Sequence, residues 1–331
     1  MPRKILLGQI PLGLILPMGE EAATPDPYIL ETIPEALAGE RIDRIVALLT
    51  ECSRAEAVAL IHDEQVLVND LVLTKPSHRL LAEDTVAVLS HPVRPTSKVL
   101  ADASVEFGLV YEDETLIVID KPAGLVVHPG AGHSGSTLVH GLIAQFPELA
   151  SVGEEFRPGL VHRLDKGTSG LLVVARTQAA YEDLVGQLSD HSVVRIYTAL
   201  AWGRFEHPQG VVDAPIGRSR RDPLRMTVAV DGRESRTHYR VDAEFTEPVE
   251  VSLITCQLET GRTHQIRVHL ASIGHAVVGD DTYGGLRRSF SAPRPFLHAR
   301  ELSFVHPATG EQVSFTSPLP ADLQGVLNRF S

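Results

Sequence analysis

The run from His162 to Gly170 reads His-Arg-Leu-Asp-Lys-Gly-Thr-Ser-Gly, and it carries the residue types in this chain that are best suited to chemistry. Asp165 lies there between a cationic residue, Arg163, and a turn rich in glycine. The segments at 157–161 and 171–175 flank the loop and are typical of strands. Because reactive groups are commonly presented on short loops of this kind, Asp165 is a candidate catalytic carboxylate. The alternative is a turn aspartate that hydrogen-bonds its own backbone.

Two further segments combine polar chemistry with strand or helix patterns. Residues 194–202 are rich in β-branched and aromatic residues, which predicts a strand that places Tyr197 on one face. In the run 259–269, Thr263 is a candidate cap for a helix whose first turn carries Arg267. A protein kinase is excluded, because Leu164 interrupts the His-Arg-Asp order and no Asp-Phe-Gly follows.

Five ordered blocks resemble the RluA-type pseudouridine synthases, which isomerise uridine to pseudouridine in ribosomal RNA. The blocks are residues 120–129, 157–176, 195–203, 261–269 and 297–299. Two stretches, Pro158 to Val161 and Gly279 to Gly284, are most similar to the branch that modifies large-subunit rRNA. The resemblance implies an isomerase that flips specific uridines of 23S rRNA into a pocket, where an aspartate assists glycosidic cleavage and C-glycoside formation.

The same resemblance implies roles for individual residues. Asp165 matches the family's catalytic acid, Tyr197 its active-site tyrosine and Arg267 the basic partner that keeps the acid ionised. Leu297 matches an apolar position of the base pocket. Three more residues are expected to bind RNA or to help flip the base, namely His162, Arg163 and Arg262. The chain departs from the usual motifs at Gly167, where the family often has an acid, and at Arg195, where it usually has lysine.

The N-terminal part resembles the small RNA-binding module named after ribosomal small-subunit protein S-four, from Glu40 to about Leu89. Periodicity predicts one helix after Arg41, a second opened by residues 53–57, and strands at 66–70 and 86–88. Arg41 and Arg54 are the first candidates for RNA contact, followed by Arg44 and Lys75. This gives a small α/β module at residues 39–90.

The remaining boundaries come from composition and turn signals. We expect a disordered extension at residues 1–38, a linker at 91–105 that is rich in proline, and a catalytic domain at 106–325. Strands predicted at 109–110, 116–119, 124–127, 171–175, 194–202, 235–243 and 249–258 outnumber helices at 137–146, 179–188 and 263–273. This order favours an α+β fold with a mixed, mainly antiparallel sheet flanked by helices.

Composition is that of a globular protein, and the charge is unevenly distributed along the chain. The chain has 331 residues, 43% of them hydrophobic and 22% charged, and a net charge of −12. Residues 1–110 carry nine Lys and Arg against sixteen Asp and Glu, whereas residues 261–300 carry six Arg against two Asp. The basic surface is therefore local, and a further basic cluster lies at Arg218, Arg220, Arg221 and Arg225.

Cysteine and histidine usage bounds the cofactors and the compartment. Cys52 and Cys256 lack metal-like spacing, and His264 and His269 are five residues apart, so we expect no metal and no other cofactor. A reducing cytoplasm suits two unpaired cysteines. No apolar run is long enough to span a membrane. We expect large-subunit rRNA or the assembling large subunit as the partner, and no obligatory protein partner.

Two alternatives come from other classes of protein. Gly130 to Gly135 reads G-x-G-x-x-G with Glu154 further on, which is the fingerprint of an NAD-dependent oxidoreductase. The second alternative is a catalytically silent RNA-binding protein that has kept the fold. The sequence leaves open which uridines are modified, how many there are, the chemical path at Asp165 and the oligomeric state.

Overall fold

The computed structural model describes residues 29–50, 52, 54–90, 99–129, 135–219, 221–222 and 225–330. The chain divides into two compact units, Met1–Thr96 and Ser97–Ser331. The described parts of these units, within residues 29–90 and 99–330, are called the N-terminal unit and the C-terminal unit. Within the described residues, no helix has the length and apolar character that crossing a membrane requires.

The N-terminal unit packs two helices and a short 3-10 helix on a small antiparallel sheet. Its helices are α1 (Ile42–Leu49) and α2 (Arg54–His62), and its 3-10 helix is η1 (Glu35–Leu37). The sheet has the order β1 (Ile29–Thr32), β4 (Thr85–Val88), β2 (Val66–Val68) and β3 (Leu71–Val72). The helices and the two strands expected from the sequence are confirmed. Apolar residues of both helices and of the sheet form one closed core.

The start of the N-terminal unit differs from the expectation. The disordered extension was expected to reach residue 38, which is wrong for residues 29–38. Strand β1 pairs with β4, from Ile29 opposite Val88 to Thr32 opposite Thr85, and Ile33 is buried in the core. An edge strand that completes the sheet gains backbone hydrogen bonds and apolar burial, which overrides the acidic, proline-containing composition. Residues 1–28 of the expected extension lie outside the described part of the chain.

The C-terminal unit is built on one large, mainly antiparallel sheet. Its order is β11-β14-β15-β10-β16-β9-β6-β5, with β17 paired to β16. The bounds are β5 (Gly108–Glu112), β6 (Leu116–Lys121), β9 (Ser169–Ala175), β10 (Val194–Trp202), β11 (Gln209–Asp213), β14 (Arg236–Phe245), β15 (Val251–Leu258), β16 (Leu297–Val305) and β17 (Gln312–Thr316). Among the described strands of this unit, only β16 and β9 pair in parallel. The expected α+β fold is confirmed.

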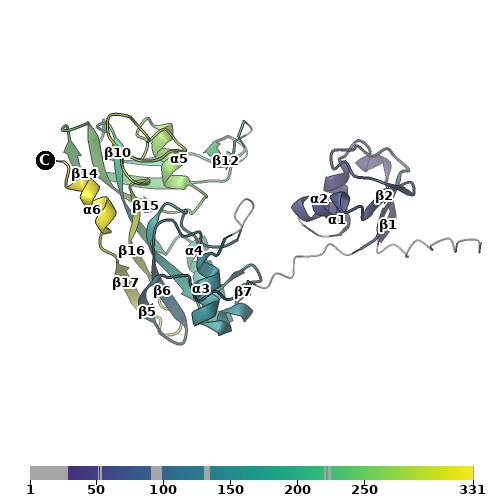
Figure 1. The fold of residues 1–331 in the computed structure, drawn as a ribbon, viewed down its shortest axis with the longest axis horizontal. Coiled ribbons are helices and arrows are strands. Elements are labelled where there is room, and N and C mark those ends of the chain that lie inside the picture. The colour runs from purple at the N-terminus through teal and green to yellow at the C-terminus, as the bar shows by residue number, and fades with distance from the viewer. Residues whose placement is uncertain are drawn as a thin grey trace, which may run out of the picture. The chain divides into compact units, whose positions relative to one another are not determined.

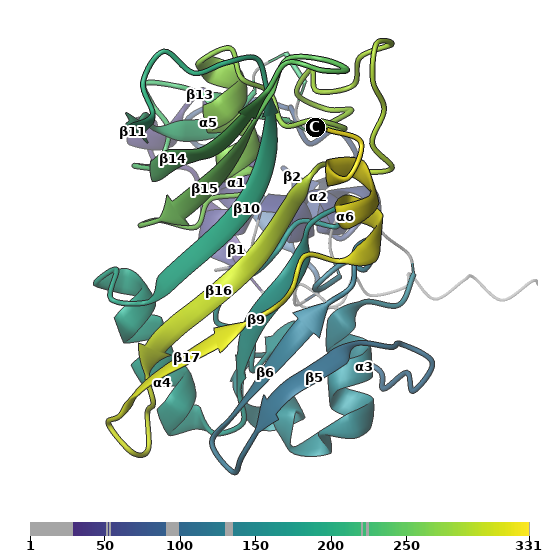
Figure 2. The same ribbon diagram turned by 90° about the vertical axis from the view of Figure 1, so that its left-hand side faces the viewer.

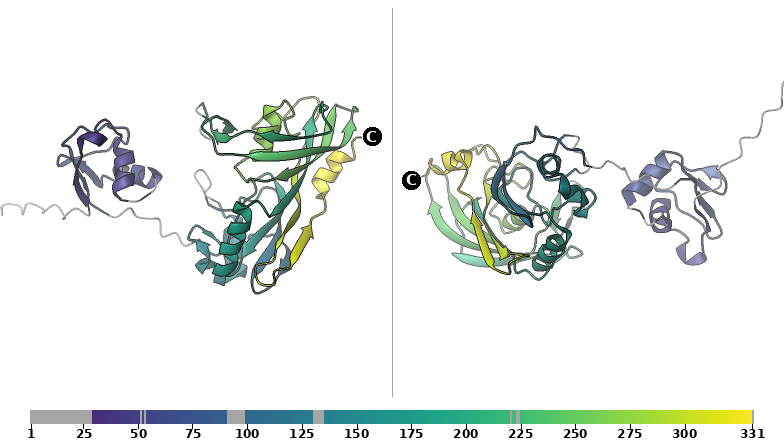
Figure 3. Two further views of the ribbon diagram at one scale, coloured as in Figure 1. Left: turned by 180° about the vertical axis from the view of Figure 1, so that it is seen from behind. Right: turned by 90° about the horizontal axis from the view of Figure 1, so that it is seen from below.

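Helices cover both faces of the large sheet. Figure 1 and Figure 2 show α3 (Leu138–Gln145), α4 (Gln178–Ser189) and α5 (Gln265–Ser272) on one face and α6 (Ala321–Leu327) on the other. Seen from behind and from below, the sheet is strongly twisted and curved (Figure 3). A 3-10 helix, η2 (Pro147–Ser151), and two small pairs complete the unit: β7 (Gly153–Glu154) with β8 (Arg157–Pro158), and β12 (Ile216–Arg218) with β13 (Met226–Val228).

Two local expectations fail in the C-terminal unit. The strand expected at 124–127 is wrong, because Gly124 has a φ of +88° and the carbonyls of Val126 and Val127 accept hydrogen bonds from the start of α3. The linker expected at 91–105 is also too long. Val99 joins the large core, and the backbone N–H of Asp102 donates to the carbonyl of His140. Residues 91–98 lie outside the described residues.

Close pairing of β9 with β16 fixes the position of the loop at 162–170. Gly170 has a φ of +115°, and a Cβ at this position would lie 2.2 Å from the carbonyl oxygen of Ala299. Only glycine permits this approach, so the motif's last residue docks the loop against β16. In the neighbouring β10–β16 pair the register shifts between Ile196 and Tyr197, because β16 has an extra residue, Arg300, between their partners Glu301 and Ala299.

Candidate active site

A cavity of about 380 Å³ with both polar and apolar lining lies on the sheet face that carries α4 and α5. Its wall includes the whole segment 160–165 and the turn that precedes α5. Among the described residues that line it, Asp165 has the only carboxyl group. Four arginines line it as well, namely Arg157, Arg163, Arg195 and Arg262. A cavity with one acid and several cations suits a polyanionic ligand that places a reacting group beside the acid.

The backbone around Asp165 is held by hydrogen bonds from three separate segments. The N–H of Thr168 donates to the carbonyl of Asp165 at 3.1 Å, and the N–H of Gly124 donates to that of Lys166 at 2.7 Å. Arg294 Nη1 donates to the carbonyl of Gly167 at 3.1 Å. With three consecutive carbonyls satisfied, the loop presents its side chain rigidly. The turn conformation expected for the motif is thus combined with a carboxylate that faces a cavity.

Asp165 shares one guanidinium with a second carboxylate. Arg267 Nη1 lies 3.3 Å from Asp165 Oδ2, while Arg267 Nε and Nη2 lie 2.6 Å and 2.9 Å from the two oxygens of Asp280. Asp280 is fully buried and also accepts the backbone N–H groups of Thr282 and Tyr283. Burial disfavours the cation, but the hydrogen bond to Asp280 and both carboxylates raise the pKa of Arg267 above its usual value. Arg267 therefore remains charged beside Asp165.

Tyr197 and Arg195 lie side by side on the cavity face of β10, because alternate residues of a strand share a face. Both are buried, and burial raises the pKa of the Tyr197 phenol to about 12. Arg195 Nη2 donates to the carbonyl of Glu259 at 2.8 Å, whereas Arg195 Nε is buried and makes no hydrogen bond within the described residues. A neutral phenol and a buried guanidinium thus form the floor of the cavity.

The other site residues expected in this unit line the same cavity. His162, Arg163, Arg262 and Leu297 all belong to its wall. Burial lowers the pKa of His162 to about 3, so its Nε2 is free to accept the backbone N–H of Val173 at 3.2 Å. Arg163 is exposed at the mouth of the cavity. The described structure therefore brings together the seven expected residues of the C-terminal unit.

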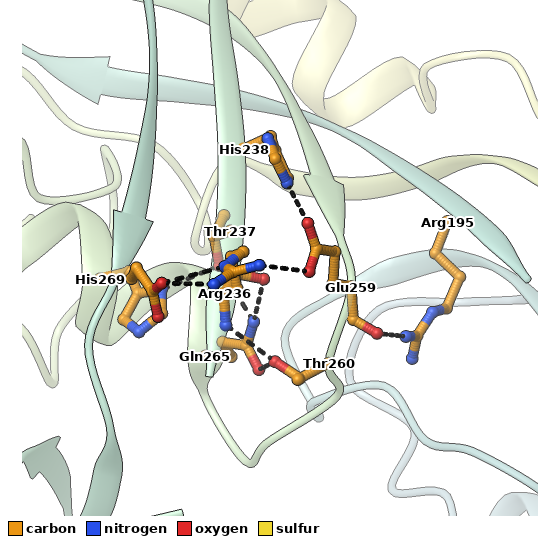
Figure 4. Close-up of polar contacts among 9 residues, drawn as sticks. Arg195, Arg236, Thr237, His238, Glu259, Thr260, Gln265 and His269 are labelled. Atoms are coloured by element: carbon orange, nitrogen blue, oxygen red, sulfur yellow. Dashed lines mark hydrogen bonds and ion pairs between the residues drawn. The ribbon is translucent and has the colours of Figure 1, made fainter. Parts of the chain in front are cut away.

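The turn before α5 is fixed by a polar network that Figure 4 shows. Gln265 Oε1 accepts the Thr260 hydroxyl at 2.7 Å (Figure 4). It also accepts the backbone N–H of Arg262 at 2.9 Å. Its Nε2 donates to the Thr237 hydroxyl and to the carbonyl of Arg236, both at 3.0 Å. His269 Nδ1 lies 2.9 Å from the Thr237 hydroxyl. A buried amide therefore holds the turn of Arg262 against β14.

The cap expected at Thr263 is wrong. The residue before α5 is His264, which has a left-handed backbone (φ +58°) and makes no side-chain cap hydrogen bond. The Gln265 side chain takes the N–H of Arg262 instead, so the chain turns sharply before the helix. This turn directs both Thr263 and His264 into the cavity wall.

Arg41 and Arg54 occur in the N-terminal unit, and there they share one carboxylate. Both guanidinium groups bind Asp43, at 2.8 Å and 3.0 Å, and Asp43 is almost completely buried. Hydrogen bonding from Arg41 lowers the pKa of Asp43, with Arg54 adding to the effect against the cost of burial. Arg44 pairs with Glu40 on the surface. The described structure thus places two partly exposed cations on one buried acid.

Several residues of the site carry no signal of their own in the sequence. Asp280 and Tyr283 belong to the stretch 279–284, which assigns them no role. No pattern marks Arg294, although it donates to Gly167, Ser169 and Leu297 and pairs with Asp322. These partners are far apart along the chain, so no local pattern marks them. The described residues contain no group of three or more His, Cys, Asp or Glu placed to hold a metal ion.

Comparison with known proteins assigns the chain to a family. The family described as RNA pseudouridylate synthase matches residues 115–272, and the S4 domain matches residues 40–86. An uncharacterized RNA pseudouridine synthase of Bacillus subtilis is 43% identical, over 88% of this chain and 94% of its own length. The ribosomal large subunit pseudouridine synthase D of Zymomonas mobilis shows the same identity and coverage. This protein belongs to the RNA pseudouridine synthases, and it is an isomerase with an N-terminal S4 domain.

Solved structures support the same assignment. The human RNA pseudouridylate synthase domain containing 1 matches with a TM-score of 0.54 and 28% identity, over 68% of this chain and 88% of that one. The human domain containing 4 matches with a TM-score of 0.52 and 27% identity, over 67% and 92%. The expected family and fold are confirmed. The oxidoreductase alternative is set aside, because the chain belongs to another family and the segment 124–129 before the glycine motif is not a strand. Residues 130–134 of the motif lie outside the described part of the chain.

Proposed function

We propose that this protein converts specific uridines of large-subunit ribosomal RNA to pseudouridine. Several relatives that are 42–43% identical carry the name ribosomal large subunit pseudouridine synthase D. The observation that carries the proposal is the single carboxylate, Asp165, in a cavity walled by arginines and paired with Arg267. A volume of about 380 Å³ accommodates one extruded nucleotide.

Asp165 acts on the bond between the ribose and the base. The isomerisation breaks the bond from C1′ to N1, forms one from C1′ to C5, and moves one proton from C5 to N1, so no outside reactant is consumed. Arg267 holds Asp165 Oδ2 at 3.3 Å and leaves Oδ1 directed toward the reacting nucleotide. The carboxylate thereby assists both cleavage and rejoining while the base is detached.

Tyr197 and Leu297 hold the base while it is detached. Both are buried in the cavity wall, one on β10 and one at the start of β16. With the pKa raised to about 12, the Tyr197 phenol keeps its proton at neutral pH, so its ring stacks and its hydroxyl donates. Leu297 contributes an apolar contact to the other side of the pyrimidine.

Cations at the mouth of the cavity position the RNA. Arg163 is exposed two residues before Asp165, where it fills the gap that the flipped nucleotide leaves in its stack. Arg262 binds phosphate beside it, and the neutral His162 supports the loop from within. In the N-terminal unit, which we take to span residues 29–90, Arg41 and Arg54 bind a second stretch of backbone.

The experiment is conversion of uridine in purified large-subunit rRNA, with and without assembled subunit proteins, in buffer that lacks cofactors and metal beyond what folds the RNA. Pseudouridine is mapped by primer extension after carbodiimide treatment and compared with rRNA from cells that lack the gene. We expect the sites that lack pseudouridine in rRNA from these cells to be the sites that the purified protein modifies in vitro. Conversion confined to transfer RNA would contradict the substrate. Tight binding without conversion would favour the catalytically silent alternative.

A further inference from the structure

His264, the residue before α5, has a left-handed backbone conformation. Its φ of +58° lies in the left-handed region, which is uncommon for residues other than glycine although histidine tolerates it better than most. The side chain does not cap α5 but lies in the cavity wall, with Nε2 at 4.0 Å from Asp165 Oδ1. This places an imidazole next to the carboxylate oxygen that faces away from the Arg267 contact.

The second nitrogen of this imidazole is fixed by Tyr283. His264 Nδ1 lies 2.7 Å from the Tyr283 hydroxyl oxygen, which also accepts the backbone N–H of Met226 at 3.0 Å. The two rings pack edge to face, with centroids 5.6 Å apart. Among the described residues, the hydroxyl oxygen has these two partners. Because the Met226 N–H is a donor, the arrangement that uses the phenol proton is donation to Nδ1.

An Nδ1 that accepts a hydrogen bond carries no proton, so in a neutral imidazole the proton is on Nε2. Burial lowers the pKa of His264 below its usual value, so the ring is neutral at pH 7 and carries its single proton on Nε2. The Nε2–H therefore faces the cavity beside Asp165 Oδ1. The distance of 4.0 Å from Nε2 to Asp165 Oδ1 is too long for a hydrogen bond, so the Nε2–H can donate to another acceptor.

The nearby substrate atom with the right chemistry is a carbonyl oxygen. In uridine the C2 carbonyl is attached next to N1, the atom that leaves C1′. A donor beside the carboxylate that acts at this bond therefore faces O2. When the bond breaks, its electron pair passes to the base, and the charge that develops is shared between N1 and O2. A neutral N–H at this place stabilises the charge without protonating Asp165.

We propose that His264 donates a hydrogen bond from Nε2 to the O2 carbonyl of the flipped uracil, and that Tyr283 is the positioning residue that fixes its tautomer. This inference rests on the proposed function. Met226 belongs to β13, so the Tyr283 hydroxyl is held by the backbone N–H of a strand residue and not by a mobile side chain.

The test compares H264Q with H264M. Both substitutions place an unbranched side chain on the same left-handed backbone, but only glutamine provides an N–H donor. In single-turnover reactions we expect H264M to be about tenfold slower than wild type, the effect of one hydrogen bond, and H264Q to stay within about threefold. Equal rates for the two variants would overturn the proposal, while loss of all conversion by the wild type would instead overturn the proposed function.

Two further measurements separate a contact with O2 from a structural effect. An RNA with 2-thiouridine at the target site offers a poor acceptor, so the difference between wild type and H264M should disappear on it. A difference of the same size on both RNAs would contradict contact with O2. For Tyr283, nitrogen NMR of labelled protein should show Nε2–H in the wild type and a mixture of tautomers in Y283F. Protonated Nδ1 in the wild type would contradict the positioning role.

Discussion

Two clusters in this protein pair arginine with buried carboxylate. One has two carboxylates for one arginine, and the other has two arginines for one carboxylate. In the C-terminal unit one arginine, Arg267, lies between Asp165 and Asp280, and both the cation and Asp280 are buried. In the N-terminal unit one acid, Asp43, lies between Arg41 and Arg54, whose side chains are 38% and 59% exposed. The first cluster presents a carboxylate to a cavity, and the second presents cations to solvent.

This contrast explains how an acidic chain acts on RNA. Ion pairs in water contribute little, but a buried partner fixes the direction of the group that stays accessible. Asp280 and the backbone N–H groups it accepts orient Arg267, and Arg267 orients Asp165. Asp43 similarly aligns two guanidinium groups at one place. One cluster is suited to chemistry and the other to binding phosphate, although the net charge of the chain is −12.

Removal of Asp280 should have the largest effect on this comparison. D280N leaves a buried guanidinium without its main partner, so we expect the free energy of unfolding to fall by about 3 kcal/mol. Conversion should slow about 100-fold, because Arg267 no longer holds Asp165 in place. Urea unfolding and single-turnover rates measure both effects. D281N, which alters an exposed neighbour, is the control, and a similar loss in that variant would contradict a specific role for Asp280.

Acid should destabilise the two units in different pH ranges. The pKa of His162 falls from 6.5 to about 3 on burial, so the unfolded chain takes up its proton first as the pH drops. The free energy of unfolding of the C-terminal unit is therefore highest above pH 6.5 and falls as the pH drops toward 3. At pH 5 the loss due to His162 is about 1–2 kcal/mol. The pKa of Asp43 is lowered from 3.8, so its contribution is lost only below that pH.

Fluorescence of the single tryptophan, Trp202 on β10, follows the C-terminal unit alone. We expect the urea midpoint measured by this signal to decline between pH 7 and pH 5. H162Q should make the decline less steep, while His128 and the other histidines whose pKa burial lowers still contribute. An equally steep decline in H162Q would show that other groups cause it.

Changes in the N-terminal cluster should alter binding and leave the chemical step unchanged. Each phosphate contact contributes about 0.7–0.9 to the slope of log affinity against log salt. For R41Q/R54Q we expect this slope to fall by about 1 to 2 and the affinity for rRNA to drop about tenfold. The rate at saturating RNA should stay that of the wild type. R44Q is the comparison, because Arg44 lies outside the Asp43 cluster and pairs with Glu40 on the surface, and its effect should be smaller.

Substitution of Asp43 should have the smallest effect. D43N keeps an acceptor between the two guanidinium groups but removes the charge that aligns them. We expect the N-terminal unit to lose about 1 kcal/mol of stability and RNA affinity to fall about twofold to threefold. Filter binding and thermal unfolding measure the two changes. A gain in affinity would mean that the acid weakens phosphate binding instead of directing the arginines.

Local sequence patterns predicted much of the fold. The strand expected at 194–202 agrees with β10, and the helix expected at 179–188 lies within α4. Both were predictable because the spacing of apolar residues that marks a strand or a helix is a local property of the sequence. The strand expected at 124–127 failed, because its apolar residues serve the entry to α3 and Gly124 turns the chain. Composition likewise misplaced residues 29–38, where pairing with β4 decides the structure.

Residue patterns made Asp165 a candidate carboxylate and singled out Tyr197 and Arg267, while their roles came from the resemblance. Asp165 and Tyr197 line the cavity, and Arg267 pairs with Asp165 from behind it. Asp280, Tyr283 and Arg294 act through contacts across the fold, such as Arg294 with Gly167, which is 127 positions away. Such partners are set by tertiary packing, and a single sequence gives no pattern for them.

The most direct test is single-turnover conversion of uridine in large-subunit rRNA by wild type and D165N at saturating enzyme, with RNA binding measured in parallel. If Asp165 acts on the glycosidic bond, D165N should bind RNA as the wild type does and convert it at least about 1,000-fold more slowly. Conversion by D165N at a rate close to that of the wild type would contradict the assignment of the reacting carboxylate and the contrast between the two clusters that rests on it.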